Sequence, residues 1–320
     1  MEDKLVVKHE ENSDSNHGKS PEERTIEELL QTGIVNIDKP AGPTSFQVTE
    51  NGKKILDAKK AGHAGTLDPG VSGVFVVGLN DGTKILKALL EAPKEYICLM
   101  RLHESAELTK LKKIFSEFSG KIFQTPPVKA AVKRVLRIRE IYEINLIEKS
   151  GKDVLFQVLC ESGTYIRRLC HDIGLALGTA AHMQQLRRTK TGPFDESSIV
   201  TLHELADAFA LWKEEGDEKY LRRAVQPLEN GLSHLQKVII SDSAVNSITH
   251  GAQLAVPGIL KYSHSLKRND LLAAFTQKGE AVMLGQALMD SDEIMEVKKG
   301  IAVKTERVLI GTDIYPRYKK

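Results

Sequence analysis

The chain has 320 residues, more than a single hydrophobic core usually organises, so its length favours two domains of unequal size. Apolar residues make up 41% and charged residues 28% of the sequence, close to the average of globular proteins, which excludes a disordered or fibrous chain. The 45 Lys and Arg residues barely outnumber the 43 Asp and Glu residues, so the net charge of +2 does not by itself indicate a nucleic-acid partner.

The cysteines and the N-terminal segment bound the class of protein further. The three cysteines form no CxxC pair, which argues against zinc ligation and a disulfide framework and suits a reducing compartment. No stretch has the length of a membrane span or the form of a signal peptide, so we expect a cytoplasmic protein without membrane contact. Residues 1–32 are expected to form a mobile arm, because the part from about Lys8 to Arg24 is polar and has nothing to bury.

The predicted ordered region begins with an alternating strand at Gly33–Asp38. The following segment, Lys39-Pro-Ala-Gly-Pro, contains two prolines and a glycine, so the strand leads into a rigid loop. Thr44 or Ser45 can then cap a helix that ends before the basic pair at Lys59.

A glycine-rich loop follows at Gly62–Gly70, and a buried strand is predicted after it at Val71–Leu79. Beyond it, the pattern mixes strands with a helix and therefore predicts an α+β fold. The strands are predicted at Tyr96–Leu102, Val128–Arg139 and Val154–Cys160, and the helix at Leu108–Phe118.

A helix is predicted at Tyr165–Leu177, where apolar residues recur at helical spacing and Gly178 can form a left-handed C-terminal cap. The helical period separates two neighbouring arginines. Arg168 lies on the far side from the apolar stripe, one turn before Asp172, where an exposed ion pair is expected. Arg167 lies about a quarter-turn from the stripe, close enough to reach a partly buried acid, although a solvated arginine explains the position equally well.

Near His234 the sequence changes to short strands with frequent turns, which indicates a small mixed β-barrel. We therefore divide the chain into an arm (1–32), a larger domain (33–233) and a C-terminal domain (234–320). Asp242 can N-cap a short helix in the last domain, and Lys278-Gly279 can form a hairpin turn. Its strands are predicted at Lys237–Ile240, Leu254–Val256, Leu271–Thr276, Ala281–Leu284 and Ile301–Leu309.

Asp68 is the strongest candidate for chemistry in the chain. Glycines on both sides of it remove side-chain bulk and leave its carboxylate and the His63 imidazole as the only reactive groups of the loop. An ordinary Asp-Pro-Gly turn explains the same residues. The loop matches neither GxxxxGK[ST] nor GxGxxG, so a nucleotide-binding loop is poorly supported.

Basic side chains and one tyrosine offer a further, weaker signal. Tyr96 fits either the interior of a strand or a platform on which a base stacks. Two basic clusters flank the glycine-rich loop, and they fit a groove that follows a phosphate backbone, although such runs are commonly solvated faces. The clusters are Lys129, Lys133, Arg134, Arg137, Arg139 and Arg187, Arg188, Lys190.

Several segments, in this order, resemble the TruB and dyskerin family of pseudouridine synthases, most closely the archaeal catalytic subunits of box H/ACA ribonucleoproteins. The C-terminal segments Gly251-Ala-Gln-Leu-Ala-Val-Pro-Gly and Gly300-Ile-Ala-Val resemble a PUA domain, an RNA-binding barrel. The other segments are Asp38-Lys-Pro-Ala-Gly-Pro-Thr-Ser, Gly62-His-Ala-Gly-Thr-Leu-Asp-Pro-Gly, Lys94-Glu-Tyr, Pro126-Pro-Val-Lys-Ala-Ala-Val-Lys-Arg, Gly163-Thr-Tyr-Ile-Arg and Leu186-Arg-Arg-Thr.

The resemblance implies a mixed, mostly antiparallel sheet around a central RNA cleft, and isomerisation of uridine in RNA without metal or cofactor. It makes Asp68 the nucleophile, Tyr96 the residue stacked under the target uracil, and Arg167 the ion-pair partner of Asp68. The implied partners are substrate rRNA or tRNA, an H/ACA guide RNA and small accessory proteins.

The resemblance also implies residues that bind the RNA or support the pocket. His63 is expected to contact RNA near the extruded base, and Lys39 and Leu186 to support the pocket. Lys133 and Arg187 are expected among the RNA-binding residues. Two other readings are a catalytically silent RNA-binding scaffold and a nucleotide-dependent enzyme, the second disfavoured by the missing phosphate loops.

Overall fold

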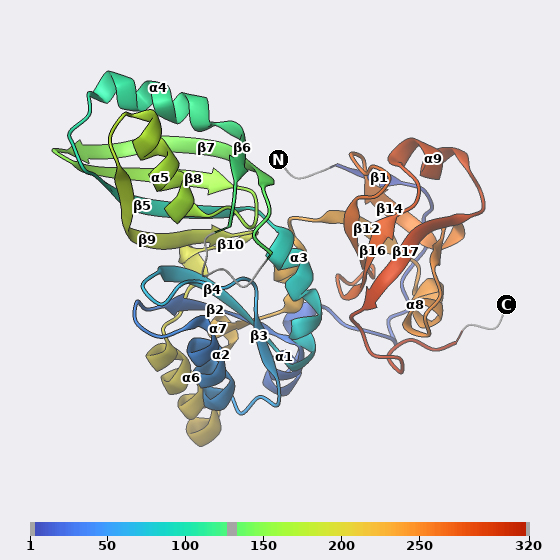
Figure 1. Cartoon of the computed structure of the whole chain (residues 1–320). Coiled ribbons are helices and arrows are strands. Elements are labelled where there is room, and N and C mark those ends of the chain that lie inside the picture. The colour runs from blue at the N-terminus through green and yellow to red at the C-terminus, as the bar shows by residue number, and fades with distance from the viewer. Residues whose placement is uncertain (1–3, 127–132, 318–320) are drawn as a thin grey trace.

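The structure, a computed structural model, describes residues 4–126 and 133–317. These residues form a larger body on a ten-stranded sheet and a smaller C-terminal body on a seven-stranded sheet (Figure 1). Only two strand pairs of the described residues are parallel, one in each sheet, so the predicted mixed and mostly antiparallel α+β fold is confirmed. None of the helices in these two ranges combines the length and the apolar character needed to cross a bilayer.

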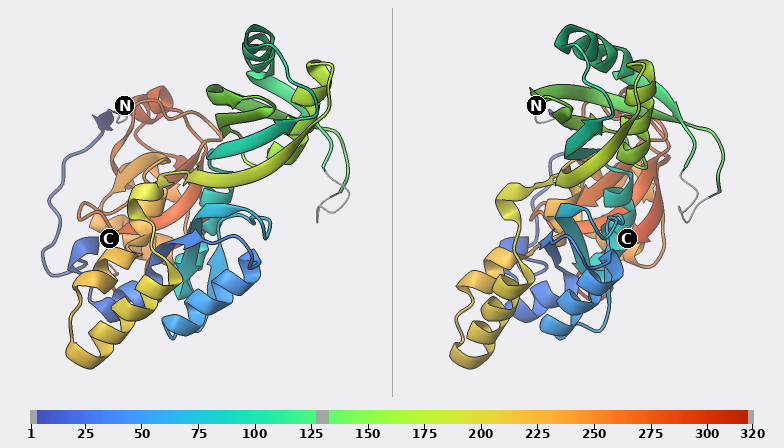
Figure 2. Two further views of the ribbon diagram at one scale, coloured as in Figure 1. Left: turned by 90° about the vertical axis from the view of Figure 1, so that its left-hand side faces the viewer. Right: turned by 60° about the vertical axis from the view of Figure 1, so that its left-hand side comes forward.

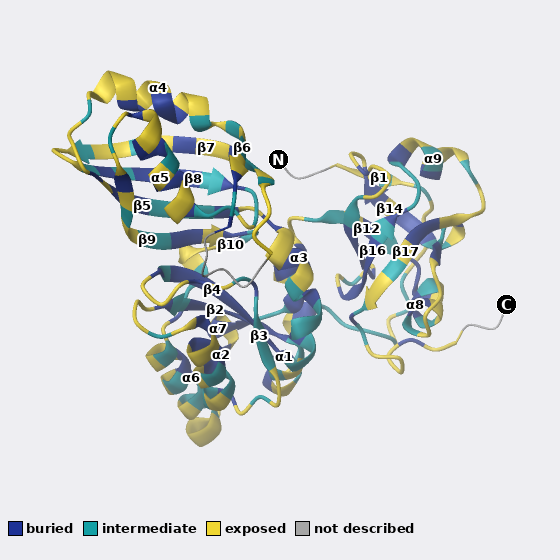
Figure 3. Ribbon diagram, viewed as in Figure 1, coloured by how far each residue is buried: buried dark blue, intermediate teal, exposed yellow. Residues whose placement is uncertain are grey.

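The first half of the larger body carries the loop that contains Asp68. β2 pairs with β4 from Ile34 opposite Gly78 to Lys39 opposite Gly73, and the helices cover these buried strands (Figure 3). The strands are β2 (Ile34–Lys39), β3 (Ala61–His63), β4 (Ser72–Leu79) and β11 (Val225–Gln226). The helices are α1 (Ile26–Thr32), α2 (Ser45–Ile55), η2 (Asn80–Ile85), α3 (Leu86–Glu91), α6 (Leu202–Glu215) and α7 (Lys219–Ala224), with the turn η4 (Leu228–Leu232).

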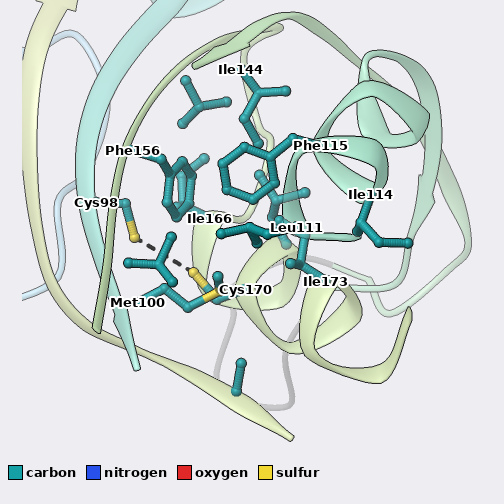
Figure 4. Close-up of a cluster of buried hydrophobic side chains, with 14 of the residues drawn as sticks. Cys98, Met100, Leu111, Ile114, Phe115, Ile144, Phe156, Ile166, Cys170 and Ile173 are labelled. Carbon is teal, nitrogen blue, oxygen red and sulfur yellow. Dashed lines mark hydrogen bonds between the residues drawn. The ribbon is translucent and has the colours of Figure 1, made fainter. Parts of the chain in front are cut away.

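The second half of the larger body is a curved sheet with two helices packed on one face. Phe115 and Phe156 meet edge to face at 5.3 Å in the core beneath these helices, and the thiols of Cys98 and Cys170 lie 3.5 Å apart there (Figure 4). The strands are β5 (Lys94–Leu102), β6 (Gly120–Gln124), β7 (Arg137–Ser150), β8 (Asp153–Cys160), β9 (Ala181–Thr191) and β10 (Phe194–Asp195). The helices are α4 (Leu108–Phe118) and α5 (Ile166–Ala176), with the turn η3 (Glu196–Ser198).

Two strands of this half differ from the sequence prediction. The predicted strand Val128–Arg139 begins in the segment 127–132, which lies outside the described residues, and the structure starts the strand at Arg137 and continues it to Ser150. β9 was not predicted, because its sequence is rich in Gln, Arg and Lys and shows no apolar alternation. It is a strand because both of its edges are paired, which overrides the weak local preference.

β9 joins the two halves of the sheet. It pairs antiparallel with β5 from Leu102 opposite Ala181 to Lys94 opposite Thr191. On its other edge it pairs parallel with β4 at only two positions, where Ser72 and Gly73 meet Arg187 and Arg188. Gly73 has φ +103°, and a Cβ there would overlap the Arg188 carbonyl, so this approach requires glycine.

The C-terminal body has its own apolar core and confirms most of the strands predicted there. Ser241 rather than Asp242 is the N-cap of its first helix, because Asp242 already occupies the first helical position. The strands are β12 (Gln236–Ile240), β13 (Leu254–Ala255), β14 (Ile259–Ser263), β15 (Leu271–Phe275), β16 (Ala281–Ala287) and β17 (Ile301–Val308). The helices are α8 (Asp242–Thr249) and α9 (Ser291–Glu296), with the turn η5 (Val256–Gly258).

The two bodies share a buried contact surface. Apolar side chains from both form one cluster, in which Ile85 and Leu89 of the larger body belong with Phe275 and Leu284 of the smaller one. Glu229 adds polar contacts, because its carboxylate pairs with Arg24 at 2.7 Å and accepts the Ala281 amide at 3.0 Å. These contacts fix how the bodies sit relative to each other.

The N-terminal residues, which the sequence predicts to be a mobile arm with nothing to bury, follow a defined path along the C-terminal body (Figure 2). β1 (Leu5–Val7) pairs with the edge of β14, and the Asp242 carboxylate accepts the Asp14 amide at 2.8 Å. The Lys278 ammonium donates to the carbonyls of Asp14, His17 and Gly18. After the turn η1 (Pro21–Glu23), α1 buries Ile26 and Leu29 against the larger body. Polar contacts thus hold the part of the arm before α1, and apolar burial holds α1 itself.

We expect Lys278→Met to loosen this N-terminal segment, because three backbone carbonyls lose a charged donor. The thermal midpoint of unfolding should fall by about 2–6 °C. Trypsin should then cleave more rapidly after Lys19. Lys112→Met, on the exposed face of α4, is the matched control and should change neither quantity. An unaltered digestion pattern in the Lys278 variant would show that these contacts do not hold the segment.

Candidate functional site

Asp68 lies in the loop between β3 and β4, and its side chain is 57% exposed. One carboxylate oxygen accepts a hydrogen bond from Nη2 of Arg167 at 2.6 Å. The rest of the carboxylate faces solvent, so a ligand can approach it directly.

Two side chains of the Lys39–Ser45 segment hold the backbone of the Asp68 loop. The Lys39 ammonium is fully buried and donates to the carbonyls of Val71 at 2.8 Å and Pro69 at 3.2 Å. Ser45 Oγ donates to the Leu67 carbonyl and accepts the Leu67 amide, both at 2.9 Å. Burial lowers the pKa of Lys39, and the nearby Asp68 carboxylate opposes that shift. Lys39 therefore stiffens the loop from inside and presents no charge to a phosphate.

Arg167 is placed by the first turn of α5. Gln124 of β6 holds the start of this helix, because its amide accepts the Tyr165 N–H at 2.9 Å and donates to the Tyr165 carbonyl at 3.2 Å. The next residue, Arg168, points the other way and donates to Asp172 at 3.0 Å. The Arg168–Asp172 pair therefore lies where the helical period predicts it, and the Arg167–Asp68 pair is the one that the resemblance implies.

Tyr96 and Leu186 lie on the same face of the sheet as α5. Both are half-buried and pack between the cores of the two sheet halves. Tyr96 lies opposite Arg188 of β9 in the sheet. Burial raises the pKa of Tyr96, so the phenol is neutral at ordinary pH. A flat, neutral aromatic face suits stacking with a base.

His63 is half-buried and packs on Phe75 with ring centroids 5.1 Å apart. Burial, followed by the positive charge of Arg188, lowers its pKa and keeps the imidazole neutral. Its Nδ1 is a buried atom without a hydrogen-bond partner in the described chain, so it can still accept or donate one bond.

The other two predicted RNA-binding residues stand apart from this group. Arg187 points to the opposite face of β9, where Asp38 binds its guanidinium at 3.0 and 3.2 Å and Glu196 binds Nε at 2.6 Å. Its charge is thus balanced within the protein. Lys133 is exposed and follows directly after the segment 127–132.

Sequence reasoning missed Arg188, the largest of the fully buried side chains. It was read only as one member of a basic run. Alternation along a predicted β9 would have placed it with Leu186 on the inner face and Arg187 on the outer face.

A hollow of about 330 Å³ opens beside the Asp68 loop, on the outer face of β5 and β9. It is lined by Ala41, Gly70, Ser72, Ile97, Leu99, Leu155, Gln185, Leu186 and Arg187. Asp68 and Tyr96 do not line it, so the carboxylate is open to solvent instead of lying in a closed pocket. Across residues 4–126 and 133–317, no group of three or more His, Cys, Asp or Glu side chains has the arrangement of a metal site.

The arrangement can support nucleophilic chemistry on a planar, base-like ligand. A carboxylate with one oxygen held by a guanidinium and its other side open is a competent nucleophile. The aromatic face of Tyr96 and the apolar side chain of Leu186 lie on the same side of the sheet.

Family models match nearly the whole chain. Residues 53–166 match the N-terminal domain of TruB family pseudouridylate synthases, and residues 167–233 match the tRNA pseudouridylate synthase B C-terminal domain. Residues 236–309 match a PUA domain, and residues 1–49 match a DKCLD domain.

Similar proteins cover the chain from end to end. A probable tRNA pseudouridine synthase B of Methanocaldococcus jannaschii is 52% identical over 99% of this chain and 95% of its own length. The Archaeoglobus fulgidus protein of the same description is 49% identical over 99% of this chain and 97% of its own length.

Two solved structures are similar over the whole fold. The matching chain in a crystal structure of a Cbf5-Nop10-Gar1 complex is 51% identical, with a TM-score of 0.95 over 99% of this chain and 97% of that one. The matching chain in an H/ACA RNP bound to a substrate RNA containing 2'-deoxyuridine is 48% identical, with a TM-score of 0.93 over 99% and 98%. The resemblance read from the motifs is therefore confirmed, and this chain belongs to the TruB family of pseudouridylate synthases and carries a PUA domain.

Proposed function

We propose that this chain isomerises uridine to pseudouridine within RNA and that Asp68 is the nucleophile. The observation that carries the proposal is the Asp68–Arg167 pair at 2.6 Å, in which the Asp68 side chain stays 57% exposed. Arg167 holds one carboxylate oxygen and so orients the other toward the substrate. No other carboxylate of the site combines an arginine partner with a glycine-rich approach on both sides.

The reaction requires the target uridine to leave its helix, because the reacting atoms are inaccessible in a stacked base. Extrusion costs on the order of a few kcal/mol, which stacking on Tyr96 offsets. The carboxylate then attacks either the ribose or the base, and the N–C glycosidic bond breaks. The uracil rotates, a C–C bond to the same ribose carbon forms, and the bond between Asp68 and the substrate breaks, which regenerates the carboxylate. The base carbon loses its proton and the base nitrogen takes one up. Reactant and product are isomers, so no oxidant, reductant or group donor is consumed.

Several residues serve RNA binding in this proposal. His63, whose imidazole is kept neutral by burial, contacts RNA near the extruded base. Leu186 supports the site from β9, and Lys133 contributes phosphate contacts. Arg187 takes part through the loop geometry that its pairs with Asp38 and Glu196 maintain.

We propose guide-RNA-directed modification of rRNA as the principal activity, with the H/ACA guide RNA and small accessory proteins as partners in the cytoplasm. The support is the close similarity to chains from a Cbf5-Nop10-Gar1 complex and from an RNA-bound H/ACA RNP. Unguided modification of the tRNA T-loop is the second candidate, which the description of the relatives as tRNA pseudouridine synthase B favours. A catalytically silent scaffold is the third reading, and the complete Asp68, Tyr96 and Arg167 set speaks against it.

One assay distinguishes these candidates. Tritium release from RNA labelled at uridine C5 should occur without added nucleotide or metal. We expect turnover on an rRNA fragment only with a matching guide RNA and accessory proteins. Turnover on free tRNA with the protein alone would favour the unguided activity. No release from either RNA would support the scaffold and overturn the enzymatic proposal.

Asp68→Asn should abolish pseudouridine formation and leave the RNA dissociation constant nearly unchanged, since an amide fills the same space but is not a competent nucleophile. The control is Asp172→Asn, which disrupts the neighbouring ion pair of α5 and should retain activity. Residual activity of Asp68→Asn above about one per cent of wild type would contradict the assignment.

The two adjacent arginines of α5 provide a second test. Arg167→Lys keeps the charge but loses the planar donor fork, so the single-turnover rate should fall about 10- to 100-fold with little change in RNA binding. Arg168→Ala removes an exposed i,i+4 pair with Asp172 that contributes about 0.2–0.5 kcal/mol, and it should leave the rate intact. Equal losses of rate in the two variants would mean that Asp68 does not depend on Arg167.

A further inference from the structure

Arg188 is a buried cation at the junction of the two sheet halves. Its side chain is among the largest of the fully buried ones, at 1% relative exposure. On β9 it lies opposite Gly73 of β4 on one edge and opposite Tyr96 of β5 on the other. It therefore touches both the strand that leaves the Asp68 loop and the strand that carries Tyr96.

Its hydrogen bonds reach both ends of the Asp68 loop. Nε donates to the Val74 carbonyl at 2.8 Å, and Nη2 donates to the Gly65 carbonyl at 3.3 Å. Asp68 lies between these two anchor points. Position 65 has φ +116°, and only a glycine adopts it without strain. The loop is thus pinned before and after the carboxylate by a single guanidinium.

The third contact of Arg188 is with Tyr96, which lies opposite it in the sheet. The positive charge of the guanidinium opposes the rise that burial causes in the pKa of Tyr96. A guanidinium has donors and no acceptor, so the Tyr96 oxygen is the atom that can face it.

The charge of Arg188 has no carboxylate partner among the described residues, and its partners are two carbonyls and a phenol. Burying an unpaired cation costs free energy that a purely structural residue avoids, because an apolar side chain of similar volume fills such a site. The same charge acts on Lys39 and His63, whose pKa values it helps to lower. Arg188 therefore acts on Tyr96, Lys39 and His63, but not on Arg167.

We propose that Arg188 is a positioning residue for the reaction. Its guanidinium contacts the Asp68 loop at two carbonyls and also contacts Tyr96, and so it fixes the position of the loop relative to the Tyr96 ring. The inference rests on the proposed function of Asp68 and adds a residue that does not touch the substrate. It predicts energetic coupling between Arg188 and Tyr96 that a role in stability alone does not produce.

The test compares Arg188→Lys and Arg188→Met with wild type, each with and without Tyr96→Phe. Arg188→Lys keeps the charge but cannot reach all three acceptors, and Arg188→Met removes the charge. We expect single-turnover rates about 30- to 100-fold lower for both, with RNA dissociation constants within about threefold of wild type. In the Tyr96→Phe background the same substitutions should cost less than about fivefold, because one of the coupled contacts is already gone.

Arg24→Met is the matched control, since it removes another largely buried arginine at the contact between the bodies. It should lower the thermal midpoint and leave the single-turnover rate within about twofold of wild type. If Arg188→Lys keeps a wild-type rate, or if its losses multiply with those of Tyr96→Phe, Arg188 is not a positioning residue.

Hydrogen exchange of the free protein gives a readout that needs no activity. Amides of residues 65–74 should exchange faster in Arg188→Met than in wild type or Arg24→Met, while the C-terminal body stays unchanged. Unaltered exchange in that segment overturns the inference even if the enzyme is active. Normal turnover by Asp68→Asn would instead overturn the proposed function and leave the exchange result standing, so the two failures are distinguishable.

Discussion

The short parallel contact between β4 and β9 is the constraint on which the rest of the larger body depends. Each half of the sheet has its own apolar core, and only the pairing at Ser72–Gly73 and Arg187–Arg188 continues the sheet between them. The approach is so close that position 73 cannot carry a side chain. Asp68 precedes this contact by a few residues, so any shift between the halves would move the carboxylate away from Arg167 and Tyr96, which both belong to the second half.

Buried cations hold the Asp68 loop, together with the apolar packing of Leu67 and Val71. Lys39 and Arg188 lie beneath it and bind the carbonyls of Gly65, Pro69, Val71 and Val74. A glycine-rich loop offers few side chains to pack, so its backbone oxygens are the available points of attachment. Charged donors make stronger hydrogen bonds than neutral ones, which compensates for part of the cost of burying them. The glycines of the loop therefore account both for the open space above Asp68 and for the attachment of the loop backbone to the cations beneath it.

The sequence predicted the parts of the fold whose pattern is local. The strands around Ile34–Lys39 and Ser72–Leu79, the α5 helix and the Arg168–Asp172 ion pair follow from periodicity and turn residues. For Arg167, periodicity left a solvated side chain open, and the Asp68 partner came from the motif resemblance. The nucleophile and tyrosine assignments came from motif resemblance, and spacing alone left them open. β9 was missed because it forms a strand only by pairing with two partners that are distant in sequence. Without β9, the sequence could not show that Arg187 and Arg188 point to opposite faces of the sheet. The path of the N-terminal segment was missed because polar contacts such as those of Lys278 produce no periodic pattern in the sequence.

The chain passes between the two bodies twice, and this double connection limits how they can move. It leaves the C-terminal body once through the segment around Pro21 and enters it again before β12. A domain attached by one linker can swing about that point, whereas attachment at two separated points removes most of the rotational freedom. The distance between the surface of the PUA domain and Asp68 is then nearly constant. An RNA that contacts both at once must therefore have a matching distance between its two contact points.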